Sequence, residues 1–397
     1  MTPKNYLLVS TTAGLFSSAA VLDVGIGVQV WYGLMAVNFL LFLWLGAVRF
    51  RSGMWLLAAA LLASGVVGLL QHTGSATLFA KQFVGILASV FYFSCYFQLT
   101  GDDPTGPFRL YVRGAYYVSI AGLVIVLVTI PFEGELPRLQ SVLAEPSMFA
   151  LVTLPAAYYC LDRYRHERTW GRELVVIGLA LLLSRSSVGY LGLLFLLTLF
   201  FARSWGRALA GLAVVAVTGA SLYAASADFR LRVDDTLRAA AEGTVEDANL
   251  STFALVSNTL VTARVLSLHP WAGNGLGSHL LSHNAYIGDV PGVAQFEEMV
   301  LHDRYTMDQL NAADANSLLL RLLSETGVLG LLLVAAFLVR NRAHGAGEAQ
   351  AINVAVLIYF FAKLLRAGHY FSPEQFFFVF AYCLTGLRRR GPREAAA

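Results

Sequence analysis

The chain alternates long apolar segments with short polar ones and has one long polar break, from Ser226 to Ala313. A helix needs about 20 apolar residues to cross the roughly 30 Å of hydrocarbon in a bilayer. About twelve segments approach that length: 6–22, 28–48, 54–71, 76–98, 110–131, 143–161, 173–184, 186–202, 207–225, 314–339, 351–366 and 371–388. The first could also be read as a signal peptide, and the seventh and eighth as one broken span.

This pattern predicts an all-α polytopic membrane protein. We expect residues 1–225 to hold nine transmembrane helices, 226–313 to form a lobe outside the membrane, and 314–397 to hold three more helices and a tail. The composition agrees, because 57% of the residues are hydrophobic and only 13% are charged. Such a chain is unsuited to a water-soluble globule.

The positive charges predict the orientation, since cationic loops are hard to translocate. With the N-terminus cytoplasmic, the short loops on that side carry most of the arginines: Arg49, Arg51, Arg109, Arg113, Arg163, Arg165, Arg168, Arg172, Arg203, Arg207, Arg340 and Arg342, followed by Arg388, Arg389, Arg390 and Arg393 in the tail. Both termini are therefore expected in the cytoplasm and the lobe outside. The net charge of +3 is explained by topology and requires no nucleic-acid partner.

Two charged residues, Arg185 and Glu145, are predicted on the outer face. The positive-inside rule does not account for an arginine there. Arg185 lies between two apolar segments, where an arginine is costly unless it pairs or reaches water. It would bind substrate, snorkel to the interface or pair with an acid such as Glu145. Glu145 itself precedes Pro146 at an expected helix start, so its carboxylate would either cap that helix or contact substrate.

A second group of cationic side chains is expected at the outer end of the eleventh span. Lys363, Arg366 and His369 follow one another at intervals of three, which would stack them on one face if the helix runs that far.

The lobe contains an apolar-periodic segment, 251–268, that carries Arg264 and is followed by Pro270, Gly273, Gly275 and Gly277. The proline and glycines are typical of a helix stop and turn. They lack the strand and the Lys-Ser/Thr of a phosphate-binding loop, so a nucleotide site is disfavoured.

Three histidines of the lobe, His279, His283 and His302, raise the question of a metal site. Their spacing matches no HExxH-type pattern. Cys95, Cys160 and Cys383 lie in apolar segments and form no ligand spacing. We expect neither a metal nor any other cofactor.

Outward arginines beside a membrane favour a substrate with a lipid-linked diphosphate. Arginine stays charged and presents a planar fork of donors to phosphate oxygens, so it can bind a diphosphate and stabilise it as a leaving group.

Several segments resemble, in order, signatures of the O-antigen ligase/polymerase superfamily (Wzy and WaaL type). The resemblance covers roughly residues 140–388. It is carried by Glu145-Pro146-Ser147, Ser184-Arg185-Ser186-Ser187-Val188-Gly189-Tyr190, Pro270 with Gly273, Gly275 and Gly277, Asn316-Ser317-Leu318-Leu319, and Glu325-Thr326-Gly327-Val328-Leu329-Gly330.

The resemblance implies a metal-independent, inverting glycosyltransferase of the membrane-embedded GT-C type. It would use undecaprenyl-diphosphate-linked glycans on the periplasmic side of a bacterial inner membrane, with a chain-length regulator and a flippase as partners. Many members have a histidine directly before the Asn-Ser/Thr element, where this chain has Ala315 preceded by Asp314. A ligase usually relies on a loop histidine as the base or to position the acceptor, so this departure lowers the expectation of a ligase. His283, His302 or Asp314 would then fill that role.

The expected reaction is therefore polymerisation of oligosaccharide repeat units into O-antigen or exopolysaccharide. Arg185 and Arg264, with Arg366 and Lys363 as further residues, are expected to bind the diphosphate. His302 is the first expected base and His283 the second. Glu145, Gly275 and Asn316 complete the expected site, Glu145 by orienting a sugar hydroxyl or an arginine and Gly275 by shaping a turn over the headgroup.

Two other functions remain open on the sequence. A ligase that transfers the glycan to lipid A core or another acceptor would share the donor chemistry. A transporter or lipid flippase would have a similar number of helices but would place its unusual charges at mid-membrane, whereas here they gather at the outer boundary. A structural scaffold would have a lobe without ordered features, and the ordered pattern from Arg264 to Gly277 argues against it.

Overall fold

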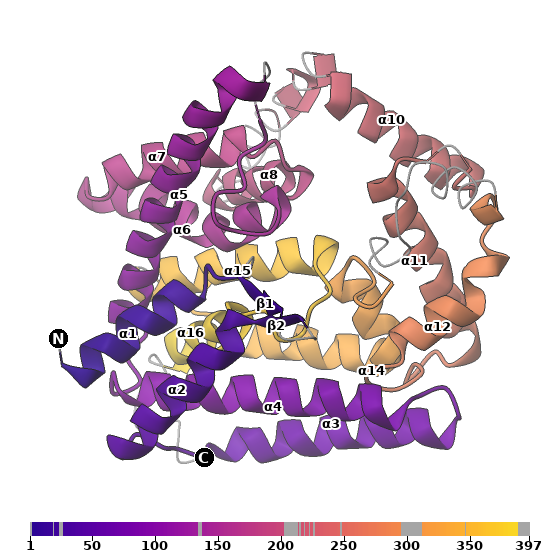
Figure 1. Ribbon diagram of the computed structural model, residues 1–397, viewed down its shortest axis with the longest axis horizontal. Helices are drawn as coiled ribbons and strands as arrows, with labels where there is room; N and C mark the ends of the chain where they lie inside the picture. The colour runs from indigo at the N-terminus through magenta and orange to yellow at the C-terminus, as the bar shows by residue number, and fades with distance from the viewer. Residues whose placement is uncertain are drawn as a thin grey trace.

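The computed structural model describes residues 2–18, 20–23, 27–133, 137–201, 213, 216–217, 219–221, 223–224, 227–246, 248–294, 312–345 and 347–387. The only strands in these ranges are β1 (Val21–Asp23) and β2 (Gly27–Gln29), which pair antiparallel with Val21 opposite Gln29. All other regular structure described is helical (Figure 1).

The first half of the chain contributes α1 (Pro3–Gly14), α2 (Val30–Trp44), α3 (Ser52–Leu70), α4 (Ala76–Gln98), α5 (Thr105–Glu133), α6 (Pro146–Glu167), α7 (Gly171–Leu183) and α8 (Ser187–Phe201). The second half contributes α10 (Ala227–Glu242), α11 (Leu250–Leu268), α12 (His279–Tyr286), the 3-10 helix η1 (Ile287–Asp289), α14 (Leu318–Arg340), α15 (Glu348–Arg366) and α16 (Gln375–Leu387).

Among the described residues, six helices are long and apolar enough to cross a membrane: α3, α4, α5, α11, α14 and α15. Three more apolar helices, α2, α8 and α16, are shorter. The chain thus has the helical membrane character expected, while twelve spans are not reproduced. Most of the expected span 207–225 lies outside the described residues.

One expectation for an individual segment differs from the structure. The expected span at 6–22 is interrupted, because α1 has 12 residues and is followed by the β1–β2 hairpin. A 12-residue helix is only about 18 Å long. In the segment expected to form the lobe, α11 is long and apolar enough to cross a membrane by length and composition.

Helix α15 occupies the centre of the fold and contacts α5, α6, α8, α14 and α16 (Figure 1). Its aromatic side chains pack into the core, where the Tyr359 ring lies 4.4 Å from that of Phe378. Figure 1 also shows α3 and α4 running side by side below α15, with α10 and α11 at the end of the molecule away from α7.

Helix α14 is broken near its middle, at Gly327, whose φ of 61° and ψ of −160° are non-helical. The loop between α11 and α12 docks at this break by backbone hydrogen bonds. Gly275 N donates to Glu325 O at 2.9 Å, and Val328 N donates to Pro270 O at 2.9 Å. The loop therefore satisfies groups that the broken helix leaves free.

Candidate functional site

A cavity of about 580 Å³ lies where the ends of several helices meet. Its lining includes the starts of α6, α8 and α11, the end of α15 and the loops that precede α14 and α16. Most of the lining residues are polar or charged. It brings together four of the residues predicted for the site: Glu145, Asp314, Asn316 and Arg366.

Helix N-termini converge on this cavity. Ser147 lies in the first turn of α6, Ser187 opens α8, and Ser251 lies in the first turn of α11. Asn316 lines the cavity directly before Ser317, the N-cap of α14, whose side chain accepts from Leu320 N. Because a helix N-terminus carries a partial positive charge, four of them around one cavity favour an anion there.

Arg366 brings a full positive charge to the cavity from the end of α15. Its Nη2 donates to Ser251 Oγ at 2.6 Å, which ties α15 to the start of α11. Arg138, from the segment between α5 and α6, lines the cavity from another side and donates to Arg185 O at 3.4 Å. Two guanidinium groups from separate elements therefore line the cavity, and guanidinium groups suit phosphate oxygens.

Glu145 occupies the N-cap position of α6, but its side chain makes no capping hydrogen bond. Its carboxylate instead accepts from Ser147 Oγ at 2.8 Å and lines the cavity. Of the two roles that the sequence left open, the geometry disfavours capping and places the carboxylate at the cavity.

Asp314 lies before α14 in a tight turn, and its Oδ1 accepts from Asn316 N at 3.0 Å. Ala315 and Asn316 have φ values of 60° and 54°, the left-handed region that few residues other than glycine and asparagine adopt. The other carboxylate oxygen, Oδ2, lies 3.0 Å from Nε2 of His369. Both Asp314 and His369 line the cavity.

Arg185 lies at the turn between α7 and α8 with a φ of 46°. The cavity lining contains its neighbours Ser186 and Ser187, and Arg185 contributes its carbonyl oxygen to Arg138. Its place is therefore at the edge of the site.

The structure places Arg264 and Gly275 away from the cavity. Arg264 is exposed near the far end of α11, 13 residues beyond Ser251, a separation of about 20 Å along a helix axis. Gly275 is buried in the loop that docks on α14 and α3. Its turn serves helix packing.

Lys363, also predicted to bind diphosphate, is buried in α15. Its Nζ donates to Tyr359 Oη at 3.1 Å and to Ser372 Oγ at 2.5 Å, and lies 3.7 Å from Glu374 Oε1. These contacts join α15 to the start of α16, so Lys363 balances a buried carboxylate rather than facing the cavity.

Of the two predicted histidine bases, His302 lies outside the described residues. His283 is buried in α12 and is not among the cavity-lining residues. Burial lowers the pKa of His283.

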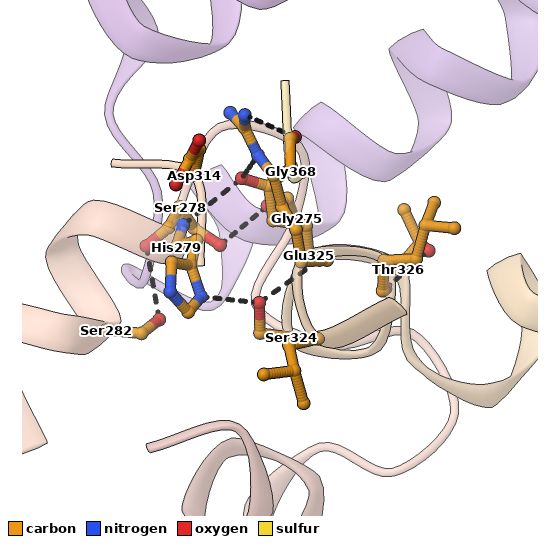
Figure 2. Close-up of polar contacts among 12 residues, drawn as sticks. Gly275, Ser278, His279, Ser282, Asp314, Ser324, Glu325, Thr326 and Gly368 are labelled. Atoms are coloured by element: carbon orange, nitrogen blue, oxygen red, sulfur yellow. Dashed lines mark hydrogen bonds and ion pairs between the residues drawn. The ribbon is translucent and has the colours of Figure 1, made fainter. Parts of the chain in front are cut away.

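His279 is the centre of a buried polar network that joins α11, α12 and α14. Its Nδ1 lies 2.7 Å from Ser324 Oγ and its Nε2 lies 2.9 Å from Asn258 Oδ1. Figure 2 shows the ring beside Ser324 and Glu325, with Asp314 and Gly368 close by. Burial, followed by the nearby charge of Arg321, lowers the pKa of His279 to about 3, so the ring is neutral.

Two residues that line the cavity, Arg138 and Ser251, carry little signal in the sequence. Arg138 lies in a short polar segment between two apolar ones, and Ser251 is one of many serines. The signal for His369 was its position three residues after Arg366, although the structure places it in the loop after α15 rather than on the helix.

An apolar groove of about 240 Å³ runs between α8 and α15 and meets the polar cavity. Its walls include Leu191 and Phe195 of α8 and Ala362 of α15. Val188 and Arg366 line both the groove and the cavity, so the two spaces adjoin.

The described fold and site define a helical membrane protein with a polar, anion-favouring cavity at its helix ends and an apolar groove beside it. No protein-family model matches the chain, and a search of curated proteins finds no significant similarity.

Proposed function

We propose that the protein is a membrane-embedded glycosyltransferase that joins undecaprenyl-diphosphate-linked repeat units into a polysaccharide. The observation that carries the proposal is the junction at Arg366. A guanidinium group there separates a cavity that favours anions from a groove that favours hydrocarbon. A donor with a polyprenyl chain, a diphosphate and a glycan has these parts in the same order.

The helix ends around the cavity provide the chemistry that such a donor needs. When the bond between the anomeric carbon and the diphosphate breaks, negative charge develops on the leaving phosphate. Arg366, Arg138 and the N-termini of α6, α8 and α11 are fixed in place before that charge appears. Preorganised donors of this kind stabilise a transition state more than a ground state.

The cavity position also favours this function over transport. Its lining comes from helix starts, helix ends and the connecting loops, which lie near a membrane face when the helices span. A transporter binds its substrate near the middle of its helices. A reaction between two bulky lipid-linked glycans requires an open face instead.

The test is reconstitution of the full chain with lipid-diphosphate-linked oligosaccharide from its host, with products separated by size in the presence of EDTA. We expect a ladder of longer lipid-linked glycans that Arg366→Ala reduces at least 100-fold. Arg366→Lys should lose most activity as well, because an ammonium group cannot make the paired contacts of a guanidinium.

The matched control is Arg264→Lys, which changes an exposed arginine at the far end of α11 and should leave the ladder intact. A ladder unaffected by Arg366→Ala would contradict the diphosphate role of Arg366. Transfer that occurs only after addition of lipid A core would identify a ligase, and no product with any acceptor would refute the proposed function.

A further inference from the structure

His369 is held at the cavity by its neighbours on both sides. It lies between α15 and α16, its side chain is 55% exposed, and it lines the cavity. The residue before it, Gly368, packs so tightly on Asp314 that an added Cβ would overlap the Asp314 carbonyl oxygen. The loop that carries His369 is therefore fixed against the turn that carries Asp314.

Arg321 of α14 holds the same loop from the interior. Its side chain is only 3% exposed, and its Nη1 donates to the carbonyl oxygen of Gly368 at 3.0 Å. Its guanidinium carbon also lies 4.3 Å from the ring centre of Tyr370. One buried arginine thus contacts the residue before His369 and the residue after it.

Arg321 is fixed in turn by Glu325, whose Oε1 lies 3.1 Å from the Arg321 Nε. Glu325 is fully buried one turn along α14, just before the break at Gly327. His279 N donates to the same carboxylate oxygen at 3.4 Å. The buried network around His279 therefore extends to the loop of His369.

From this geometry we infer that His369 is the general base of the glycosyl transfer, oriented by Asp314, with Arg321 as a positioning residue for the loop. The inference rests on the proposed function, since it supplies the group that accepts the proton of the acceptor hydroxyl.

The step balances as follows. The carboxylate beside Nε2 favours the tautomer with its proton on Nε2, which leaves the Nδ1 lone pair to accept a proton. The acceptor hydroxyl oxygen forms a bond to the anomeric carbon as its proton passes to Nδ1. The bond from that carbon to the diphosphate breaks, and its electron pair leaves on the phosphate oxygen. Asp314 then balances the imidazolium charge.

Among the described residues that line the cavity, His369 is the only imidazole. The unperturbed pKa of an imidazole, about 6.5, lies near neutral pH. A base is most effective when its pKa lies near the working pH. The charged groups around His369 come from several elements. Asp314 lies in the turn before α14, Arg321 belongs to α14, Lys363 and Arg366 belong to α15, and Glu374 lies at the start of α16. Although the His369 side chain opens to the cavity, the protein packed around the ring desolvates it and lowers the pKa of His369, and the Asp314 carboxylate opposes that shift. A lowered pKa leaves the ring neutral and able to accept a proton at neutral pH.

The test uses the full chain, purified and reconstituted, with binding of undecaprenyl diphosphate and transfer from the host's lipid-linked oligosaccharide measured separately. We expect His369→Gln to reduce kcat by about 10²–10⁴-fold, the usual contribution of a general base, with undecaprenyl diphosphate affinity changed less than threefold. His344→Asn is the matched control, because His344 is exposed in the loop between α14 and α15.

The pH profile separates a catalytic role from a structural one. In the wild type, kcat/KM should fall on the acid side as His369 is protonated. Asp314→Asn removes the charge that raises the His369 pKa, so the acid limb should move to lower pH while the maximum rate drops. Arg321→Lys, which cannot hold Gly368 and Tyr370 together, should lower kcat without moving that limb.

These measurements test the role of His369 separately from the glycosyltransferase function. A His369→Gln protein that transfers at the wild-type rate, or an acid limb unmoved in Asp314→Asn, would overturn the role of His369 and leave the proposed function standing. A wild-type protein that neither binds undecaprenyl diphosphate nor transfers glycan would overturn both.

Discussion

Gly275 and Gly68 touch backbone to backbone, because a Cβ added to Gly275 would lie 2.5 Å from the Cα of Gly68. Gly275 also has a φ of 91°, which a residue with a side chain rarely adopts. The loop before α12 can therefore dock on α3 only with glycine at this position.

We expect Gly275→Ala to destabilise the protein by more than about 3 kcal/mol, since steric overlap with fixed backbone adds to the conformational strain. Gly243→Ala is the matched control: Gly243 also has a positive φ, 68°, but an added Cβ would meet nothing within 4 Å. That change should cost about 1 kcal/mol. Thermal unfolding of both purified variants makes the comparison, and equal losses would contradict the docking role.

The neutral, buried His279 ring predicts a loss of stability in acid. Between pH 6.5 and 3 the unfolded chain binds a proton at this residue and the folded chain does not, so stability falls as the pH falls. The loss should reach about 2 kcal/mol at pH 5.

His279→Gln isolates this effect, because glutamine does not titrate. The variant should be less stable than the wild type at pH 7.5, where it weakens the bonds to Ser324 and Asn258. At pH 5 the difference in unfolding free energy should narrow by about 2 kcal/mol. An unchanged difference would mean that His279 is protonated in the folded protein.

Lys363 is expected to act in stability rather than in substrate binding. Lys363→Met leaves Glu374 buried without its cationic partner, and breaking a buried pair in this way costs about 3–5 kcal/mol. The double change Lys363→Met with Glu374→Gln should recover much of that loss. Undecaprenyl diphosphate affinity of the folded fraction should stay within threefold of the wild type; a tenfold loss would return Lys363 to the diphosphate site.

The groove between α8 and α15 predicts that donor affinity depends on the length of the lipid. Ala362→Phe fills part of its 240 Å³ and should raise KM about tenfold for an undecaprenyl donor. A donor with a short prenyl chain should be affected much less. Ala336→Phe, at an exposed position on α14, is the control for a new aromatic side chain on a helix surface. Equal effects on long and short donors would argue against the groove as a lipid site.

The sequence by itself predicted the helical membrane character and much of the helix order, because long apolar segments have few alternatives to spanning a bilayer. The segment expected at 76–98 is α4, with the same bounds. A helix start marked by local chemistry, such as the one at Pro146, could also be predicted from the chain. The interrupted segment at 6–22 could not, since an apolar residue count does not distinguish a helix from a helix followed by a hairpin.

The candidate site was decided by tertiary structure. Three cationic residues have apolar neighbours in the sequence but different surroundings in the fold. Arg366 lines the cavity, Lys363 lies beside the buried carboxylate of Glu374, and Arg264 is exposed near a helix end. The pairing of His369 with Asp314 joins residues 55 positions apart through two loops. Side-chain surroundings depend on which helices meet. Residue type and spacing determine which helices form, and only the packed fold determines which charges share a cavity.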